Sequence, residues 1–261
     1  MIRDATFEVS SREFSAFLKA VESVNGNGVT INVHKDYLDA ISLSDDNSSV
    51  VLYARIVLVN SQDIPDDALN ESINVRDFKK FKILLTMNGE EDTFRFTVRE
   101  NKVYFRNNKI KSARFVLGEI PMTAKSRITP EWFNHFKKEV VMHTNRREIS
   151  NIVNLSRFSS TDADKVYFTT TEDGMLEAEI DNHDMMNTDK VTVVVGRVDS
   201  GAIRDKVIVK VKTLEMLSFA GEDILLETSD IGANGKSQEI MFISYINDNV
   251  SIRYLLNSMR S

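Results

Sequence analysis

Basic side chains interleaved with small polar ones are the residues of this sequence best suited to a specific chemistry. Arg12, Ser15 and Lys19 follow one another at helical spacing near the start, and a similar series begins at Arg147. Lysine and arginine beside serine and asparagine suit contact with phosphate groups and carry no information about base sequence. The pattern therefore favours a polyanion, such as a nucleic-acid backbone, as the ligand.

Residues for catalysis are few. The four histidines are scattered, none at a metal-ligand spacing, and there is no cysteine for a thiolate, a disulfide or a zinc site. The run Asp181-Asn182-His183-Asp184 is more typical of a polar turn than of a cation site. The sequence contains no phosphate-binding glycine loop, dinucleotide fingerprint or nucleophile elbow. We therefore expect no catalytic residue, no metal site and no cofactor.

Amphipathic helices must position the cations. We expect helices from Ser10 to about Val24, from Asn74 to about Met87, from Asn145 to about Ser159, and a shorter one from Lys212 to about Ala220. Counting about 100° per residue, the first three each have an apolar side and a basic side that is short of acids. The fourth contributes only Lys212 to the basic set. An ordinary solvated face is the alternative, but such faces usually mix both signs of charge.

Strands outnumber helices in this sequence. The β-branched runs 50–53, 56–59, 191–195 and 240–246 are typical of strands. A few helices among many strands indicate the α+β class with antiparallel sheets. Thr129-Pro130-Glu131 indicates the start of a short helix, and the acidic stretch 62–70 is expected to be a loop.

The same series of segments occurs twice along the chain. Arg12-Glu13-Phe14 returns as Arg147-Glu148-Ile149, and 112–117 returns as 251–256. Five such pairs in the same order, at offsets of about 135–139 residues, indicate a duplicated module. Chance likeness between chains of mixed helix and strand is the alternative. We expect two tandem copies with two helices each, at 1–121 and 141–261, joined by a connector at 122–140.

Bulk composition limits the class of protein. The 261 residues are 42% hydrophobic, enough for a core in each copy, and the net charge is −6. An acidic exterior with one basic surface is compatible with this sum. The sequence has neither an apolar run long enough for a membrane span nor a secretory leader at its start. We therefore expect an intracellular protein that does not contact membranes.

The layout resembles that of the DNA polymerase sliding clamps, both the proliferating cell nuclear antigen type and the clamps of tailed bacteriophages. The paired helices beginning Ser11-Arg12-Glu13-Phe14 and Arg147-Glu148-Ile149 carry the resemblance, together with the terminal strand 251–256. It covers nearly the whole chain and rests on layout rather than on a short motif. It implies a homotrimer closed head to tail into a ring, with helices around the hole and sheets outside.

The resemblance also implies a function and a set of contact residues. Such a ring slides on double-stranded DNA without sequence specificity, tethers a DNA polymerase, and is loaded by an ATPase clamp loader. It is not an enzyme and uses no cofactor, and a phage-encoded clamp would work in the host cytoplasm. The DNA-facing residues implied here are Arg12, Lys19, Arg76, Lys79, Lys80, Arg146, Arg147, Arg157 and Lys212.

The resemblance implies subunit edges as well. A late strand of the first domain, 111–117, would pair with a strand near 176–182 in the neighbouring subunit. Lys111 and Arg114 on the first would face Glu177 and Glu179 on the second. Edges of opposite charge favour pairing with each other over pairing with themselves, and such heterologous contacts can close a ring. Two ordinary solvent-exposed edge strands are the alternative.

Partner peptides would dock near the connector and the C-terminus. The residues implied for this role are Tyr254, Leu255, Leu256, Ile120 and Pro121. The alternative is that these apolar side chains belong to the core.

Three other functions stay open at this point. A monomeric processivity factor with the same fold would grip DNA directly with its basic faces. A structural or assembly protein built from duplicated β-rich domains would show no DNA dependence. An enzyme of unrecognised type would lose its activity on substitution of a single histidine or aspartate.

Overall fold

The computed structural model describes residues 4–44, 50–61, 64–89, 92–118, 130–159, 164–181, 190–219, 221–232 and 238–258. By its contacts the chain divides into two compact units. Unit 1 holds the described residues of 1–45, 52–129 and 246–252, and unit 2 holds those of 46–51, 130–245 and 253–261. The division at 121 and 141 that the sequence suggests stays a prediction, because most of the expected connector lies outside the described residues.

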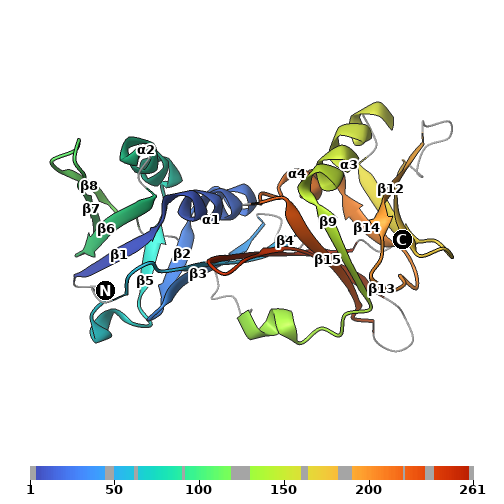
Figure 1. The fold of residues 1–261 in the computed structure, drawn as a ribbon, viewed down its shortest axis with the longest axis horizontal. Coiled ribbons are helices and arrows are strands. Elements are labelled where there is room, and N and C mark those ends of the chain that lie inside the picture. The colour runs from blue at the N-terminus through green and yellow to red at the C-terminus, as the bar shows by residue number, and fades with distance from the viewer. Residues whose placement is uncertain are drawn as a thin grey trace. The chain divides into compact units, whose positions relative to one another are not determined.

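Unit 1 contains one four-stranded sheet and four neighbouring strands of a second sheet (Figure 1). The first has the order β1-β6-β7-β8 and the second the order β4-β3-β2-β5. The elements are β1 Ala5–Ser10, α1 Ser11–Val24, β2 Val29–Val33, β3 Tyr37–Leu43, β4 Val50–Val57, η1 Asp66–Ala68, β5 Ser72–Val75, α2 Phe78–Asn88, β6 Thr93–Arg99, β7 Lys102–Phe105 and β8 Ala113–Val116.

Unit 2 repeats this plan. Its sheets have the orders β12-β11-β10-β14 and β13-β9-β15-β16-β17. The elements are η2 Pro130–Asn134, β9 Val140–Asn145, α3 Arg146–Ser159, β10 Lys165–Thr170, β11 Met175–Ile180, β12 Val191–Arg197, β13 Ser200–Gly201, β14 Val207–Lys210, α4 Val211–Glu215, β15 Asp223–Asp230, β16 Glu239–Ile246 and β17 Val250–Asn257. Apart from β13 and the 3-10 turns, each element has its counterpart in unit 1, in the same order. The predicted α+β class with two helices per copy is therefore confirmed.

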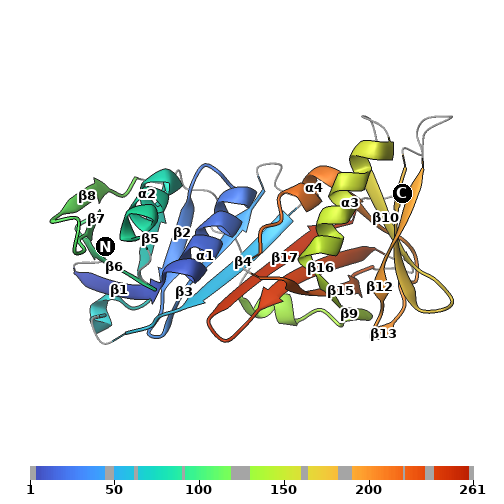
Figure 2. The same ribbon diagram turned by 45° about the horizontal axis from the view of Figure 1, so that its top comes forward.

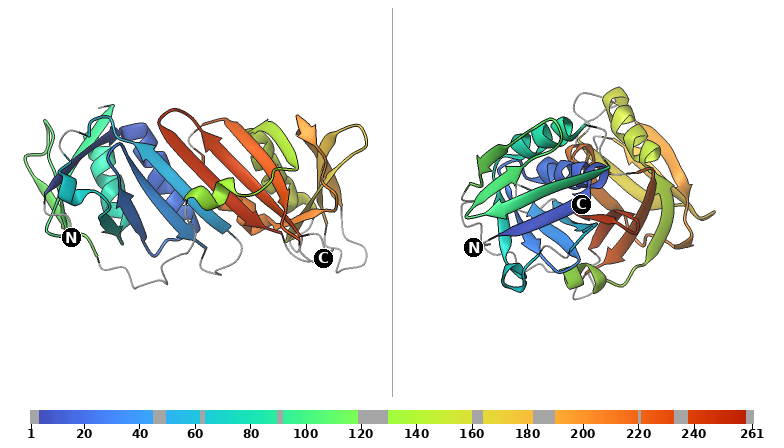
Figure 3. Two further views of the ribbon diagram at one scale, coloured as in Figure 1. Left: turned by 90° about the horizontal axis from the view of Figure 1, so that it is seen from below. Right: turned by 60° about the vertical axis from the view of Figure 1, so that its left-hand side comes forward.

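The two helices of each unit pack against each other and against the strands. In unit 1, α1 contacts α2 and reaches both sheets, through β1 and β6 on one and β3 on the other. In unit 2, α3 contacts α4 and reaches both sheets through β9 and β11. Figure 2 shows each pair side by side, and Figure 3 (left) shows the strands of each unit in front of its helices. The unpacked sides of both pairs are therefore free to carry charge.

A cluster of phenylalanine rings fills the core of unit 1. Phe14 of α1 is fully buried and stacks on Phe94 and Phe96 of β6, with ring centroids 5.7 and 5.6 Å apart. Phe81 of α2 meets Phe14 edge-on at 5.6 Å. Aromatic pairs at such separations add to the free energy gained from burial. This cluster fixes α1 and α2 on the sheets, and with them the outward sides of both helices.

Short polar residues begin the longer helices, largely as the sequence predicts. The hydroxyl of Ser10 accepts from the Glu13 amide at 3.4 Å, and Asn145 Oδ1 accepts from the Glu148 amide at 3.0 Å. Both satisfy amides that have no partner within the helix. The predicted starts of α1 and α3 are correct to one residue.

Two predicted helices differ from the structure. The helix expected from Asn74 begins at Phe78, because 72–75 pairs with β2 as strand β5 and the Asn74 amide oxygen accepts from Thr30 at 2.9 Å. Asp77 is the N-cap and accepts from the Lys79 amide at 3.1 Å. The fourth helix, α4, ends at Glu215 and not near Ala220. At the expected connector helix the structure has only the 3-10 turn η2.

Lys138 is a partly buried cation in unit 2. Its Nζ lies 3.6 Å from Glu227 Oε2 and 3.1 Å from the centroid of the Phe242 ring, and its side chain is 23% exposed. Burial lowers the pKa of Lys138 to about 8 from its ordinary value of 10.5, and the Glu227 carboxylate opposes only part of that shift. The folded protein therefore favours the neutral amine of Lys138 more than the unfolded chain does.

This lowered pKa predicts a protein that gains stability as the pH rises. Between about pH 8 and 10.5 the unfolded chain binds more protons at Lys138 than the folded one, so the free energy of unfolding increases through this window. Below about pH 8 both states are protonated and the cost of burying the charge is fully present. In urea unfolding we expect the free energy of unfolding to increase by about 1–2 kcal/mol between about pH 7 and 9.5. Lys138→Met should lack this increase, and the exposed-site control Lys137→Met should retain it. Identical pH dependence in wild type and Lys138→Met would contradict it.

Candidate nucleic-acid interface

In unit 1 the predicted cations lie on the outward sides of the helix pair. Arg12 and Lys19 on α1 and Lys79 and Lys80 on α2 are all exposed. Arg76 is also exposed, but it lies in the junction between β5 and α2 and not on a helix as predicted. The five side chains are therefore accessible to a ligand that approaches the helices of this unit.

The helix pair of unit 2 has the same arrangement. Arg146, Arg147 and Arg157 of α3 and Lys212 of α4 are exposed, and Ile149 and Ile152 on the opposite side of α3 are buried. Lys210, a basic residue left out of the predicted set, is also exposed, immediately before α4. Lys210 is the last residue of strand β14, and the residues before it in the strand are buried. An apolar strand-like run that ends in a lysine was therefore the sequence signal for this exposed cation.

The few acids near these cations have local structural roles. Glu13 and Glu148 occupy the first turns of α1 and α3, where a negative charge interacts favourably with the helix dipole. Glu22 of α1 pairs with Lys82 of α2, which joins the two helices of unit 1. In unit 2, Glu215 of α4 lies 3.9 Å from Arg157 of α3 and joins the corresponding pair.

Most of the predicted cations keep an uncompensated charge. Lys80 lies 3.6 Å from its helix cap Asp77, and Arg157 has the long contact to Glu215. Among the described residues the others form no ion pair: Arg12, Lys19, Arg76, Lys79, Arg146, Arg147 and Lys212. Each helix pair therefore presents a positive surface in a chain whose net charge is negative.

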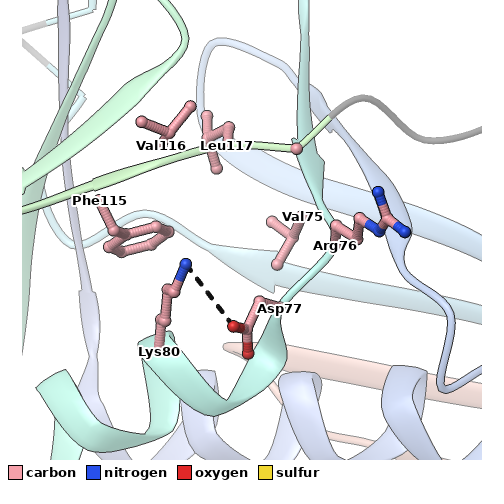
Figure 4. A pocket seen from close by; sticks show the side chains of 8 residues that line it. Val75, Arg76, Asp77, Lys80, Phe115, Val116 and Leu117 are labelled. Carbon is pink, nitrogen blue, oxygen red and sulfur yellow. Dashed lines mark ion pairs between the residues drawn. The ribbon is translucent and has the colours of Figure 1, made fainter.

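A pocket of about 350 Å³ joins the cations of unit 1 to the edge strand β8 (Figure 4). Arg76, Asp77 and Lys80 line one side, and Phe115 and Val116 with their neighbours line the other. Lys80 Nζ lies 5.9 Å from the centroid of the Phe115 ring, while the guanidinium of Arg76 extends away from it. The positive surface of unit 1 thus borders directly on a sheet edge.

Strand β8 ends its sheet, as the sequence predicts for 111–117. It pairs with β7 alone among the described strands. Arg114 on β8 and Lys111 before it are exposed, and the Val116 side chain is 59% exposed. An open edge that carries an exposed valine is a site for pairing with another chain. The interface role of Lys111 and Arg114 stays a prediction.

The second predicted edge, near 176–182, is wrong. These residues include strand β11, which pairs with β10 on one side and β12 on the other, so it offers no free edge. Glu177 and Glu179 are partly buried on this interior strand, and Glu179 pairs with Lys190 at 2.6 Å. The contact raises the pKa of Lys190 and neutralises one of the two predicted interface acids.

Among the described strands, β12 and β14 end this sheet, and β12 is the strand next to β11 at its edge. Residues 191–195 read Val-Thr-Val-Val-Val, and the Val194 side chain is 51% exposed. Neither acid nor base occurs in 191–196, so the expected charge complementarity is absent at the edge itself. The repeat could have identified 176–178 as interior, because these residues match 38–40 of the interior strand β3.

The predicted peptide site is also wrong in part. The side chains of Tyr254, Leu255 and Leu256 are 0%, 5% and 0% exposed, respectively. The Tyr254 hydroxyl donates to the Ser218 carbonyl at 2.8 Å and accepts from the Ser218 amide at 3.0 Å. These three residues of β17 belong to the core, as the alternative interpretation holds. Ile120 and Pro121 lie outside the described residues.

No helix in the described parts of the chain is long and apolar enough to cross a membrane. Comparison by sequence finds neither a protein-family model nor a curated protein that matches.

Comparison by structure finds the chain similar to sliding clamps. Proliferating cell nuclear antigen from Entamoeba histolytica matches with a TM-score of 0.70 at 11% identity, over 99% of both chains. The antigen of A. fulgidus, solved with the C-terminal region of FEN-1 bound, matches with a TM-score of 0.71 at 11% identity, over 98% of both chains. The DNA polymerase III beta subunit of Thermotoga maritima gives a TM-score of 0.62 at 18% identity, over 98% of this chain and 66% of that one. The chain therefore has the sliding-clamp fold that the sequence resemblance implies.

Proposed function

We propose, from this clamp fold, that the protein is a DNA sliding clamp: three copies close into a ring around duplex DNA and tether a DNA polymerase. The observation that carries the proposal is the charge on the helices. All nine cations predicted to face DNA are exposed, and the acids around them are engaged in helix caps and pairs between helices. Cations on an otherwise acidic chain suit a polyanion that contacts only the helical surface.

Loose contacts suit this role. A ring remains on DNA because of its topology, so its contacts need to be weak and independent of sequence. Isolated lysine and arginine side chains on helices attract phosphates without reading bases, and their attraction decreases steeply with salt. The proposal includes no catalytic residue and no cofactor.

The open edges support ring closure. Strand β8 of one copy and strand β12 of the next are both unpaired on one side among the described strands, and each carries an exposed valine. Pairing of two unlike edges is heterologous, and heterologous contacts form rings when the rotation between copies closes. Lys111 and Arg114 lie beside this contact in the proposal.

The partners follow from the same proposal. A closed ring must be opened to admit DNA, which assigns a clamp-loader ATPase to this protein. The A. fulgidus structure with a FEN-1 segment bound supports docking of partner peptides on clamps of this fold. We place the protein inside the cell, and in the host cytoplasm if a phage encodes it.

Two measurements test the proposal. Light scattering should give the mass of three chains, and primer extension on a long template should give longer products when protein and loader are added together. A mass of one chain with binding to short linear DNA would instead indicate a monomeric processivity factor. Unchanged product lengths together with no DNA binding would reject a role in DNA synthesis.

A further inference from the structure

Three carboxylates from distant parts of the sequence meet in unit 2. Glu139 directly precedes β9, Asp230 ends β15 and Glu239 begins β16. Strand β15 pairs with both β9 and β16, and its register places Asp230 opposite Glu239. Oxygen atoms of the three carboxylates lie within 4.8 Å of one another. Because the sheet register holds all three, their proximity is a built feature of this fold.

Glu239 is buried with its carboxylate directed into this cluster. The residue is 3% exposed, and no described residue donates a hydrogen bond of normal geometry to either of its oxygens. Oε2 of Glu139 is buried and unpartnered in the same way among the described residues. The backbone amide and guanidinium of Arg204 oppose the effect of burial and of the neighbouring acids, but the pKa of Glu239 is still raised. A buried carboxylate with incomplete hydrogen bonding is costly unless something else satisfies it.

Negative charge predominates around Glu239. Two acids, Glu139 and Asp230, act on its carboxylate, and the guanidinium of Arg204 is the cation that opposes them within the described parts of the chain. A guanidinium nitrogen of Arg204 lies 3.2 Å from Glu139 Oε1. Lys138, next to Glu139 in sequence, is engaged with Glu227. The cluster would therefore gain from further positive charge.

Asp230 is already held in position for a ligand. Its Oδ1 accepts from the amides of Gly232 at 2.7 Å and Gln238 at 3.0 Å. These bonds fix the carboxylate at the base of the β15–β16 hairpin. Its orientation is therefore set before an ion binds, which reduces the entropy that binding would cost.

We propose that Glu139, Asp230 and Glu239 bind a hard divalent cation, with Ca²⁺ the preferred ion. The donors are carboxylate oxygens only, whereas zinc and copper favour histidine and cysteine. Ca²⁺ accepts irregular sets of about six to eight oxygens and completes them with water, whereas Mg²⁺ requires a nearly octahedral set. The ion ties the start of β9 to the hairpin and supplies the missing positive charge.

Thermal unfolding of the full chain tests this site. Protein freed of metal with a chelator is heated alone and with millimolar CaCl₂, MgCl₂ or MnCl₂. With Ca²⁺ at about one hundred times its Kd, we expect the Tm to rise by roughly 5 °C, and less with Mg²⁺. Calorimetric titration should give one Ca²⁺ per chain. No DNA is present, so the result is independent of ring function.

Charge-removing variants assign the site to these residues. Glu239→Gln keeps the shape of the side chain and removes the repulsion, so its metal-free Tm should equal or exceed that of wild type. Its Tm should no longer respond to Ca²⁺, and Glu139→Gln should bind Ca²⁺ with an affinity at least ten-fold lower than that of wild type. Glu172→Gln, an exposed acid in the turn between β10 and β11, is the matched control and should respond as wild type does.

Two outcomes would overturn the proposal. A wild-type Tm that no divalent ion changes, with no heat of binding, would mean that a proton on Glu239 satisfies the cluster. A Ca²⁺ response that survives in Glu239→Gln at full size would place the ion elsewhere on the protein.

Discussion

Replacing Arg146 and Arg147 together by glutamate is expected to reduce processive DNA synthesis roughly 30-fold, because each reversed cation costs about 1 kcal/mol of attraction to phosphate. Both side chains are exposed at the first turn of α3, and neither forms an ion pair among the described residues. The measurement is product length in primer extension with polymerase and loader at near-physiological salt. The deficit should grow as salt falls, since repulsion is then less screened.

The fold of this variant should be intact. Acids in the first turn of a helix are favoured by its dipole, so the two introduced glutamates would not weaken α3, and a thermal melt should show an unchanged or higher Tm. Lys35→Glu with Lys137→Glu makes the same charge change at exposed positions off the helices and serves as the control. Equal product lengths for both variants would mean that α3 does not face DNA.

Val116→Asp and Val194→Asp are each expected to convert the proposed trimer to single chains. In the proposed ring both valines become buried between β8 and β12, and a buried, unpaired carboxylate costs about 3 kcal/mol per contact, or more than 100-fold in association. The two side chains are exposed in the single chain, so its folding should be unaffected. Light scattering at micromolar concentration measures the mass.

Val59→Asp is the matched control for these variants. Val59 is 57% exposed, against 59% for Val116, but it lies on neither edge strand. It should therefore keep the mass of wild type. A trimer that persists in both edge variants would exclude β8 and β12 as the contact surface.

Helix starts and core faces could be predicted from local sequence. Ser10 and Asn145 cap their helices because a short polar side chain reaches the free amides of the first turn, and this needs no tertiary context. Asn74 has the same chemistry but bonds to Thr30 of β2 instead. Pairing between strands decided that start, and the strand partner is remote in sequence.

The position of a strand within its sheet could not be read from its residues. Leu176-Glu177-Ala178-Glu179-Ile180 alternates between apolar and acidic residues, which a strand shows at an edge and in an interior position alike when one face meets solvent. The valine-rich run 191–195 looks like a buried strand but ends its sheet. Only the pairing partners separate the two cases.

Burial of the C-terminal strand had a similar cause. Tyr254 to Leu256 are apolar on consecutive positions, which a partner pocket and a fully buried strand explain equally well. Contacts from both faces of β17, including Ser218 to the Tyr254 hydroxyl, make it core. The acidic cluster of unit 2 left no trace in sequence because the sheet register alone assembles it.

In the proposed ring the two unlike edges, β8 and β12, give each subunit a direction, because each edge pairs only with the other kind. A chain altered at Val116 retains a sound β12, and a chain altered at Val194 retains a sound β8. When the two variants are mixed, the intact β12 of one can pair with the intact β8 of the other. No third subunit can then join, because the two remaining edges carry the substitutions. Such a pair of subunits cannot close into a ring. Comparing it with the wild-type assembly would separate the stability that ring closure adds from the stability of a single subunit contact.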